Sequence, residues 1–117
     1  MEKLRTEVRS PVTYEHLLRQ ELDRIVSVLK IMGAEKVILF GSLARGRENI
    51  FSDLDLIVVM NSEWDFVQRH GRIYRQLNPK VDADILVYTP EEFARMQRTP
   101  FIRHVLKEGI VVYAKNS

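Results

Sequence analysis

The chain has 117 residues, of which 45% are hydrophobic and 29% charged, and its formal net charge is +2. This length allows one modest core, so we expect a single domain over residues 1–117 with its core at about 12–113. The lack of cysteine excludes disulfides and thiolate metal sites, and no apolar run is long enough to span a membrane. The small net charge does not by itself indicate a nucleic-acid partner, and none is expected.

The first half of the chain predicts a long helix and then two strands with a glycine-containing turn between them. Apolar residues recur at helical spacing from about 12 to 32, and Gly33 is a stop signal. Lys36–Phe40 is a short apolar run rich in strand formers, and residues 41–46 follow it as a turn into a short helix. Leu54–Met60 is a nearly continuous apolar stretch of strand length.

The second half predicts a helix, a strand, further helical sequence and a last strand. A helical stripe runs from Phe66 to Leu77, and Val81–Tyr88 is a strand. Thr89-Pro90-Glu91-Glu92 is a helix start with a capping threonine, proline at the first position and glutamate at the third. Gly109 ends the helical sequence, and Ile110–Tyr113 is a short strand. This order predicts an α/β (α+β) domain with helices packed on a mixed sheet, although it does not fix the strand directions.

Two carboxylates mark the start of the second predicted strand. Residues two apart in a strand point to the same face, so Asp53 and Asp55 project side by side. Two such carboxylates repel unless a cation lies between them, and magnesium prefers oxygen ligands. An alternative is that Asp53 caps a turn and Asp55 faces solvent. The apolar residues 56–59 favour a metal site, because a buried strand rarely tolerates adjacent carboxylates without a use for them.

The turn after the first predicted strand is a candidate phosphate site. Gly41 has no Cβ, so a phosphate could approach the backbone there, and Ser42 could donate its hydroxyl. The amides that follow would lie at a helix N-terminus, which attracts anions. Arg45 could neutralise phosphate charge, although a surface or salt-bridge arginine is an equal alternative.

Other polar residues have structural interpretations. His16 and His104 have no partner at ligand spacing and His70 falls in a helical stripe, so all three are expected to be structural. Trp64 could stack on a base, but packing is favoured, and most helical arginines, Arg69 among them, are expected to form a solvated face.

The Gly41-Ser42-Leu-Ala-Arg45-Gly46 and Ser52-Asp53-Leu-Asp55-Leu56 segments together resemble the motif of the DNA polymerase β-like nucleotidyltransferases, in particular the minimal nucleotidyltransferase (MNT) type. The resemblance implies a mixed-sheet fold with an acidic triad on its open face. It also implies transfer of a nucleoside monophosphate, most simply AMP from ATP, from a magnesium-bound NTP to a hydroxyl. Two Mg²⁺ ions held by Asp53, Asp55 and a third carboxylate would serve that chemistry.

The resemblance requires the third carboxylate on a later strand, where Asp82 and Asp84 share a face. The spacing from Asp84 to the Thr89-Pro90 helix start fits the family pattern better, so Asp84 is preferred and Asp82 is kept as the alternative.

The acceptor could be a protein hydroxyl, a small molecule or an RNA end. Small size and the resemblance together imply an antitoxin role, with a small helical HEPN-type protein as partner and one of its tyrosines as a candidate acceptor. The alternative is a non-catalytic antitoxin that neutralises its partner by complex formation. Self-association is compatible with an open sheet face. The charged N-terminus is unlike a signal peptide, so a cytoplasmic location is expected.

Overall fold

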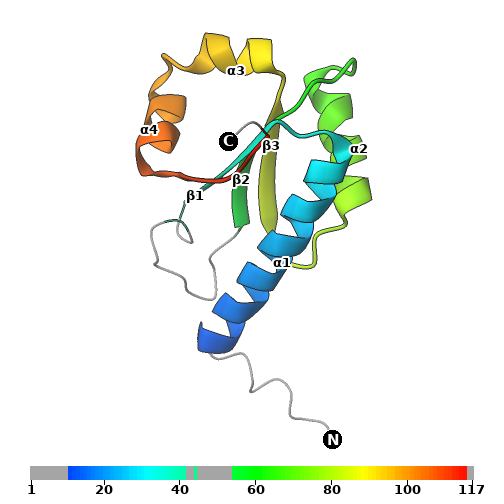
Figure 1. Cartoon of the computed structure of the whole chain (residues 1–117), viewed down its shortest axis with the longest axis vertical. Coiled ribbons are helices and arrows are strands. Elements are labelled where there is room, and N and C mark those ends of the chain that lie inside the picture. Colours follow the sequence, from blue (N-terminus) through cyan, green and yellow to red (C-terminus); the bar gives the residue numbers. More distant parts are fainter. Residues whose placement is uncertain (1–10, 42–43, 45–53, 116–117) are drawn as a thin grey trace, which may run out of the picture.

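The computed structural model describes residues 11–41, 44 and 54–115. Their elements run in chain order (Figure 1) as α1 (Pro11–Met32), β1 (Lys36–Phe40), β2 (Leu54–Val59), α2 (Phe66–Leu77), β3 (Ala83–Tyr88), α3 (Pro90–Met96), α4 (Pro100–Glu108) and β4 (Ile110–Ala114). These bounds lie within about two residues of those expected from the sequence. The short helix expected after Gly41 lies, apart from Gly41 and Ala44, outside the described residues.

The strands form a mixed sheet in the order β3-β2-β1-β4. β1 pairs antiparallel with both β2 and β4, whereas β2 and β3 are parallel and are connected through α2. The α+β class and the mixed sheet predicted from the sequence are therefore confirmed. The strand directions, which the sequence left open, place β3 at one edge of the sheet and β4 at the other.

Alternation along the strands gives the sheet two different faces. On one face Leu54, Leu56 and Val58 of β2 join the larger core cluster, which α1 and α2 cover. On the other face Ile57 and Val59 join a smaller cluster made with α3 and α4. The helices accordingly lie on the two sides of the sheet in pairs (Figure 1). Because successive strand residues point to opposite faces, Asp55 lies on the face of Ile57, beside the smaller cluster.

The helical sequence after β3 is two helices rather than the one expected segment. Thr89 forms the predicted capping box with Glu92 at the start of α3. A second cap follows, in which the Thr99 hydroxyl accepts a hydrogen bond from the Ile102 amide and Pro100 occupies the first turn of α4. Proline disfavours helical backbone in the residue before it, so α3 ends and a new helix begins with its own cap.

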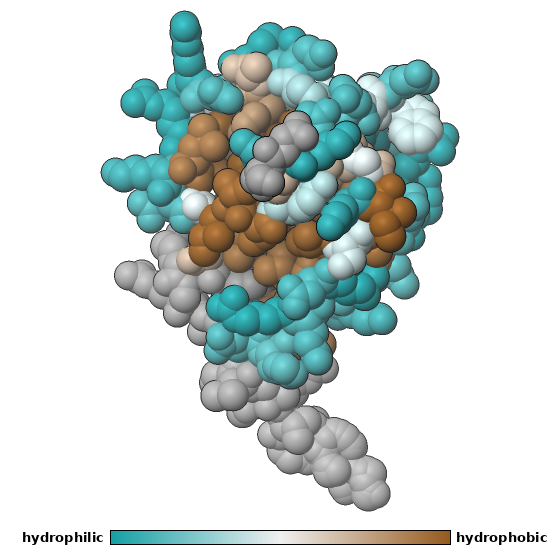
Figure 2. All heavy atoms as spheres, viewed as in Figure 1, coloured by the Kyte–Doolittle hydropathy of each residue, from teal (hydrophilic) through white to brown (hydrophobic). Residues whose placement is uncertain are grey.

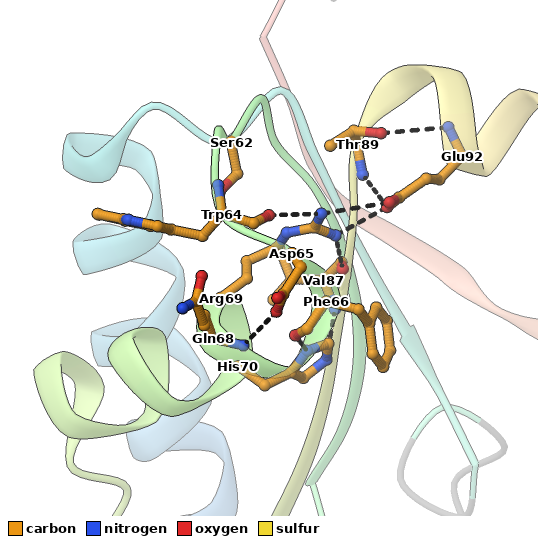
Figure 3. A network of polar contacts seen from close by, with 10 residues as sticks. All are labelled: Ser62, Trp64, Asp65, Phe66, Gln68, Arg69, His70, Val87, Thr89 and Glu92. Atoms are coloured by element: carbon orange, nitrogen blue, oxygen red, sulfur yellow. Dashed lines mark hydrogen bonds and ion pairs between the residues drawn. The ribbon is translucent and has the colours of Figure 1, made fainter.

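Helix α2 covers the outer edge of β3 with polar side chains (Figure 3). Arg69 Nη1 donates to Val87 O at 2.8 Å and to Glu92 Oε1 at 2.7 Å, and its Nη2 donates to Trp64 O at 3.0 Å. His70 Nε2 accepts from the Val87 amide at 3.0 Å, so His70 Nδ1 is the protonated nitrogen and donates to Phe66 O. Exposed strand edges invite pairing with other chains, and these contacts occupy that edge.

The environment of Arg69 corrects the expectation of a solvated arginine. Its side chain is only 3% exposed, and its guanidinium lies between the α2 N-terminus, β3 and α3 (Figure 3). The paired carboxylate of Glu92 is what makes burial of this charge tolerable. His70, by contrast, has the structural role expected for it.

The surface seen in Figure 2 has apolar residues gathered across its middle, with polar side chains around them. In the part of the chain that the structure describes, no helix combines the length and apolar character needed to cross a membrane.

Candidate active site

Asp55 and Asp84 lie next to each other on neighbouring strands. The two residues are partners in the parallel register of β2 and β3. Register partners in adjacent strands point to the same face, so both carboxylates rise from the face that α3 and α4 only partly cover. Asp55 is half-buried and Asp84 is exposed. The sequence placed Asp55 beside Asp53 on one strand, but only the parallel pairing brings in the carboxylate of Asp84.

A cavity of about 370 Å³ lies over these carboxylates. Asp55 and Asp84 line it together with residues from β1, β3, α2 and α4, namely Phe40, His70, Tyr74, Ile85, Leu86 and Phe101. Phe40 pairs with Asp55 across the β1–β2 ladder, and its ring packs edge-on against that of Phe101 at 5.7 Å between centroids. The cavity therefore offers two acidic groups on one side and flat aromatic walls on the other.

Gly41 follows β1 and touches the same acidic centre. Its φ of +80° lies in the left-handed region, which glycine adopts without strain. A Cβ at this position would lie 3.1 Å from Cγ of Asp55 and closer still to its Oδ2. Gly41 was expected to leave space for a phosphate. The structure shows a further reason for glycine, which is that the carboxylate of Asp55 occupies the space of the missing side chain.

Tyr74 is a cavity residue that the sequence presents only as part of a helical stripe. Burial raises the pKa of its hydroxyl, and the negative charges of Asp84 and Asp55 raise it further. The hydroxyl is therefore a neutral hydrogen-bonding group, and it contacts the backbone of Ala83 and Ile85 on either side of Asp84. The sequence could not predict that Tyr74 lines this cavity. A tyrosine at an apolar position of an amphipathic helix is typical of core packing, and its neighbour β3 is known only from the fold.

The other predicted site residues lie outside the described part of the chain or, like Asp82, do not line this cavity. Asp53, Ser42 and Arg45 lie outside the described residues. Asp82 is exposed and precedes β3, and its carbonyl accepts a hydrogen bond from the Leu54 amide at 3.1 Å. Among residues 11–41, 44 and 54–115, no three His, Asp or Glu side chains form a group that could hold a metal ion. The described part of the predicted triad is thus Asp55 with Asp84.

A larger cavity of about 960 Å³ lies away from these carboxylates, between the end of α1, the segment after β2, and α2. Trp64 is on its rim, with the Arg72 guanidinium 4.0 Å from the ring centroid and 46% of the tryptophan exposed. Arg69 lines it from within, and its buried Nε has no hydrogen-bond partner among the described residues. Trp64 therefore stacks with an arginine at a surface distant from Asp55, rather than facing the acidic cavity.

A parallel strand pair carrying facing carboxylates, next to a glycine turn on a mixed sheet, is the arrangement expected of a nucleotidyltransferase. Residues 23–117 match the family model described as polymerase beta, nucleotidyltransferase. The chain belongs to this nucleotidyltransferase family.

One of two similar curated proteins has a name that agrees with this assignment. A protein of Methanocaldococcus jannaschii named "putative protein adenylyltransferase" is 34% identical over 80 residues, which are 68% of this chain and 78% of the relative. A protein of Thermococcus gammatolerans is 32% identical over 85 residues, which are 73% of this chain. It is named "probable ribosomal RNA small subunit methyltransferase A". The match covers only 28% of that protein, so its name does not bear on the activity of this chain.

Solved structures share the fold. A putative minimal nucleotidyltransferase is 30% identical, covers 82% of this chain and 93% of its own, and has a TM-score of 0.60. A toxin–antitoxin crystal structure with AMP-PNP covers 80% of this chain and 73% of its own, with 20% identity and a TM-score of 0.57. A nucleotidyltransferase structure from Sulfolobus solfataricus covers 100% of this chain and 95% of its own, with 21% identity and a TM-score of 0.57.

Proposed function

We propose that this nucleotidyltransferase moves AMP from magnesium-bound ATP to a hydroxyl group, and that Asp53, Asp55 and Asp84 are its catalytic carboxylates. The observation that carries the proposal is the register pairing of Asp55 with Asp84 over the aromatic-walled cavity. The M. jannaschii relative, named for protein adenylyltransfer, supports adenylyl transfer over other nucleotides.

The donor set fits a hard divalent cation. Asp55 and Asp84 offer carboxylate oxygens on one face of the sheet, which are the ligands that Mg²⁺ prefers. In this proposal they hold the metal together with Asp53, and two ions are accommodated as in other phosphoryl-transfer sites. When bound, Mg²⁺ neutralises phosphate charge and favours ionisation of the attacking hydroxyl.

The protein's own residues orient the reactants. Gly41 and Ser42 hold the terminal phosphates through the backbone and the serine hydroxyl, and Arg45 offsets their negative charge. The acceptor oxygen then attacks the α-phosphorus in line, the bond to the bridging oxygen breaks, and pyrophosphate leaves. Asp84 accepts the proton that the hydroxyl loses. Asp84 is preferred to Asp82 for this role because Asp84 lines the cavity and pairs with Asp55.

The acceptor in this proposal is a tyrosine of a small helical HEPN-type partner, which the chain neutralises as an antitoxin. The aromatic walls of the cavity, Phe40 and Phe101, suit a phenol ring beside the carboxylates. The fold shared with the chain of a toxin–antitoxin structure is compatible with this role.

The deciding experiment incubates the chain with ATP, Mg²⁺ and a small all-helical protein encoded beside it, and analyses both proteins by mass spectrometry. We expect an AMP adduct on a tyrosine of the partner, and loss of the adduct with Asp53→Asn or Asp84→Asn. Asp82→Asn, just before β3 and two residues from Asp84, is the matched control and should retain most of the activity. Inhibition of the partner without any adduct would instead establish the non-catalytic antitoxin.

Equal activity of wild-type and Asp84→Asn protein, together with an inactive Asp82→Asn variant, would reverse the assignment of the third carboxylate. Wild-type turnover by Asp53→Asn would refute the metal role of the Asp53–Asp55 pair.

A further inference from the structure

The two peptide groups on either side of Asp84 are held by one side chain. The Tyr74 hydroxyl, which reaches across from α2, donates to Ala83 O at 2.5 Å and accepts from the Ile85 amide at 2.7 Å. Ala83 and Ile85 are the immediate neighbours of Asp84 in β3. A single oxygen atom therefore bridges the backbone just before and just after the carboxylate.

These contacts lie on the side of β3 away from the rest of the sheet. β3 is an edge strand, paired only with β2, and Asp84 is in register with Asp55 on the paired side. The Ala83 carbonyl and the Ile85 amide point outward from that edge, toward Tyr74 of α2. β2 fixes Asp84 from within, and Tyr74 fixes the same three-residue stretch from outside.

We propose that Tyr74 is the positioning residue for Asp84, holding the strand backbone so that the third carboxylate stays opposite Asp55. This inference rests on the proposed function, because it requires Asp84 to act with Asp55. Tyr74 does not bind the metal in this view. It restricts the backbone motion of the edge strand β3 at Ala83–Ile85, where a shift would move Asp84 away from Asp55.

A protonated Tyr74 hydroxyl is what the two hydrogen bonds to the β3 backbone require. Burial and the neighbouring charges of Asp84 and Asp55 raise its pKa, so the proton that it donates to Ala83 O is retained at and above neutral pH. A neutral hydroxyl can donate and accept at the same time, as both contacts require.

The competing interpretation is that Tyr74 only seals the edge of β3, as His70 and Arg69 do further along at Val87. Sealing alone predicts a loss of stability when the hydroxyl is removed, without an effect on the acidic site. Positioning predicts a weaker metal site even in protein that is still fully folded.

The test compares Tyr74→Phe with wild type and with Ile73→Val, all as the full chain. Ile73 is the adjacent α2 residue, 5% exposed in the larger core cluster, and its truncation loosens α2 without touching the hydrogen bonds around Asp84. Mn²⁺ binding, in the presence of a non-hydrolysable ATP analogue, is measured by water proton relaxation. Amide exchange of Ile85 is followed by NMR under conditions where all three proteins are folded.

We expect Tyr74→Phe to bind Mn²⁺ about 10-fold more weakly, a loss typical of outer partners of metal ligands. Its Ile85 amide should exchange faster, whereas Ile73→Val should keep wild-type Mn²⁺ affinity. Unchanged Mn²⁺ affinity in Tyr74→Phe, or an unchanged Ile85 exchange rate, overturns this inference alone. An equal loss of affinity in Ile73→Val also overturns it, since general loosening of α2 would then suffice. Wild-type protein that does not bind Mn²⁺ overturns the proposed function and this inference with it.

Discussion

Gly41 meets two demands at the scale of a single residue. Its backbone has φ of +80°, and its missing Cβ leaves room for the Asp55 carboxylate. A glycine-serine turn already suggests a residue that tolerates positive φ and a backbone that a phosphate can approach. The need for space beside Gly41 for the Asp55 carboxylate could not be predicted, because Asp55 is remote in sequence and reaches Gly41 only through the antiparallel pairing of β1 with β2.

Gly41→Ala is therefore expected to abolish nucleotide transfer, because the new methyl group displaces the Asp55 carboxylate. It should also cost at least about 1 kcal/mol of unfolding free energy, from the strain of a side chain at positive φ. Urea unfolding and the adduct assay measure the two effects separately.

Gly33→Ala is the matched control. Gly33 also has positive φ, at +102°, but a Cβ there meets no atom within 4 Å. We expect a similar loss of stability with activity retained. Full activity of Gly41→Ala would mean that transfer does not depend on the Asp55 carboxylate staying in the space beside residue 41.

At the scale of elements, α2 shows that hydrophobic periodicity predicts the bounds of a helix but not the burial of its polar side chains. The helical stripe from Phe66 to Leu77 predicted the bounds of α2, and the capping box at Thr89 predicted the start of α3. The same pattern could not distinguish Arg69 from the exposed arginines of α2. Arg69 is buried because β3 and α3 converge on it, and that convergence is a property of the tertiary structure.

The ion pair between Arg69 and Glu92 makes stability depend on pH. The hydrogen bond from Arg69, together with that from the Thr89 amide, lowers the pKa of Glu92 to about 2. A carboxyl with a lowered pKa stabilises the fold above its ordinary pKa, and that contribution is lost as protons bind the folded state. We expect unfolding free energy to fall between about pH 4.5 and pH 2, by about 1–2 kcal/mol, since a partly exposed pair is screened.

Urea titrations across this range, in wild type and Glu92→Gln, measure the effect. Glu92→Gln should be less stable at pH 7 and should lose much of the pH dependence. Glu91→Gln, one residue earlier in α3, is the control and should behave as wild type. A pH profile of Glu92→Gln parallel to that of wild type would exclude the ion pair as the cause.

At the scale of the whole molecule, the sequence predicted the elements and their class but not how they meet. Apolar strands such as β1 and β2 were evident, because buried strands are short runs rich in branched residues. Their order and direction follow from connections and packing that no local pattern encodes. The pairing of Asp55 with Asp84 is a product of that arrangement, so the sequence required the family resemblance to nominate Asp84.

Binding of nucleotide with metal should stabilise the entire fold. At a ligand concentration a hundred times Kd, linkage adds about 2.7 kcal/mol to the unfolding free energy, which raises Tm by several degrees. Thermal melts with MgATP should show this rise in wild type, a much smaller rise in Asp84→Asn, and none with ATP and a chelator. An equal rise in Asp84→Asn would place the nucleotide away from this carboxylate.

The alternation of buried and exposed side chains along β3 also disfavours a shift in its register against β2. Ile85 and Val87 are 1% and 0% exposed on the face covered by α1 and α2, and Asp84 precedes them in the strand, facing the other way. A slip of β3 by one residue against β2 would turn the side chain of Asp84 into the larger core and that of Ile85 to the opposite face of the sheet. Such a mispaired form buries a carboxylate and exposes an isoleucine, so it is disfavoured before catalysis is involved. A stable core and the alignment of Asp55 with Asp84 therefore depend on the same strand register.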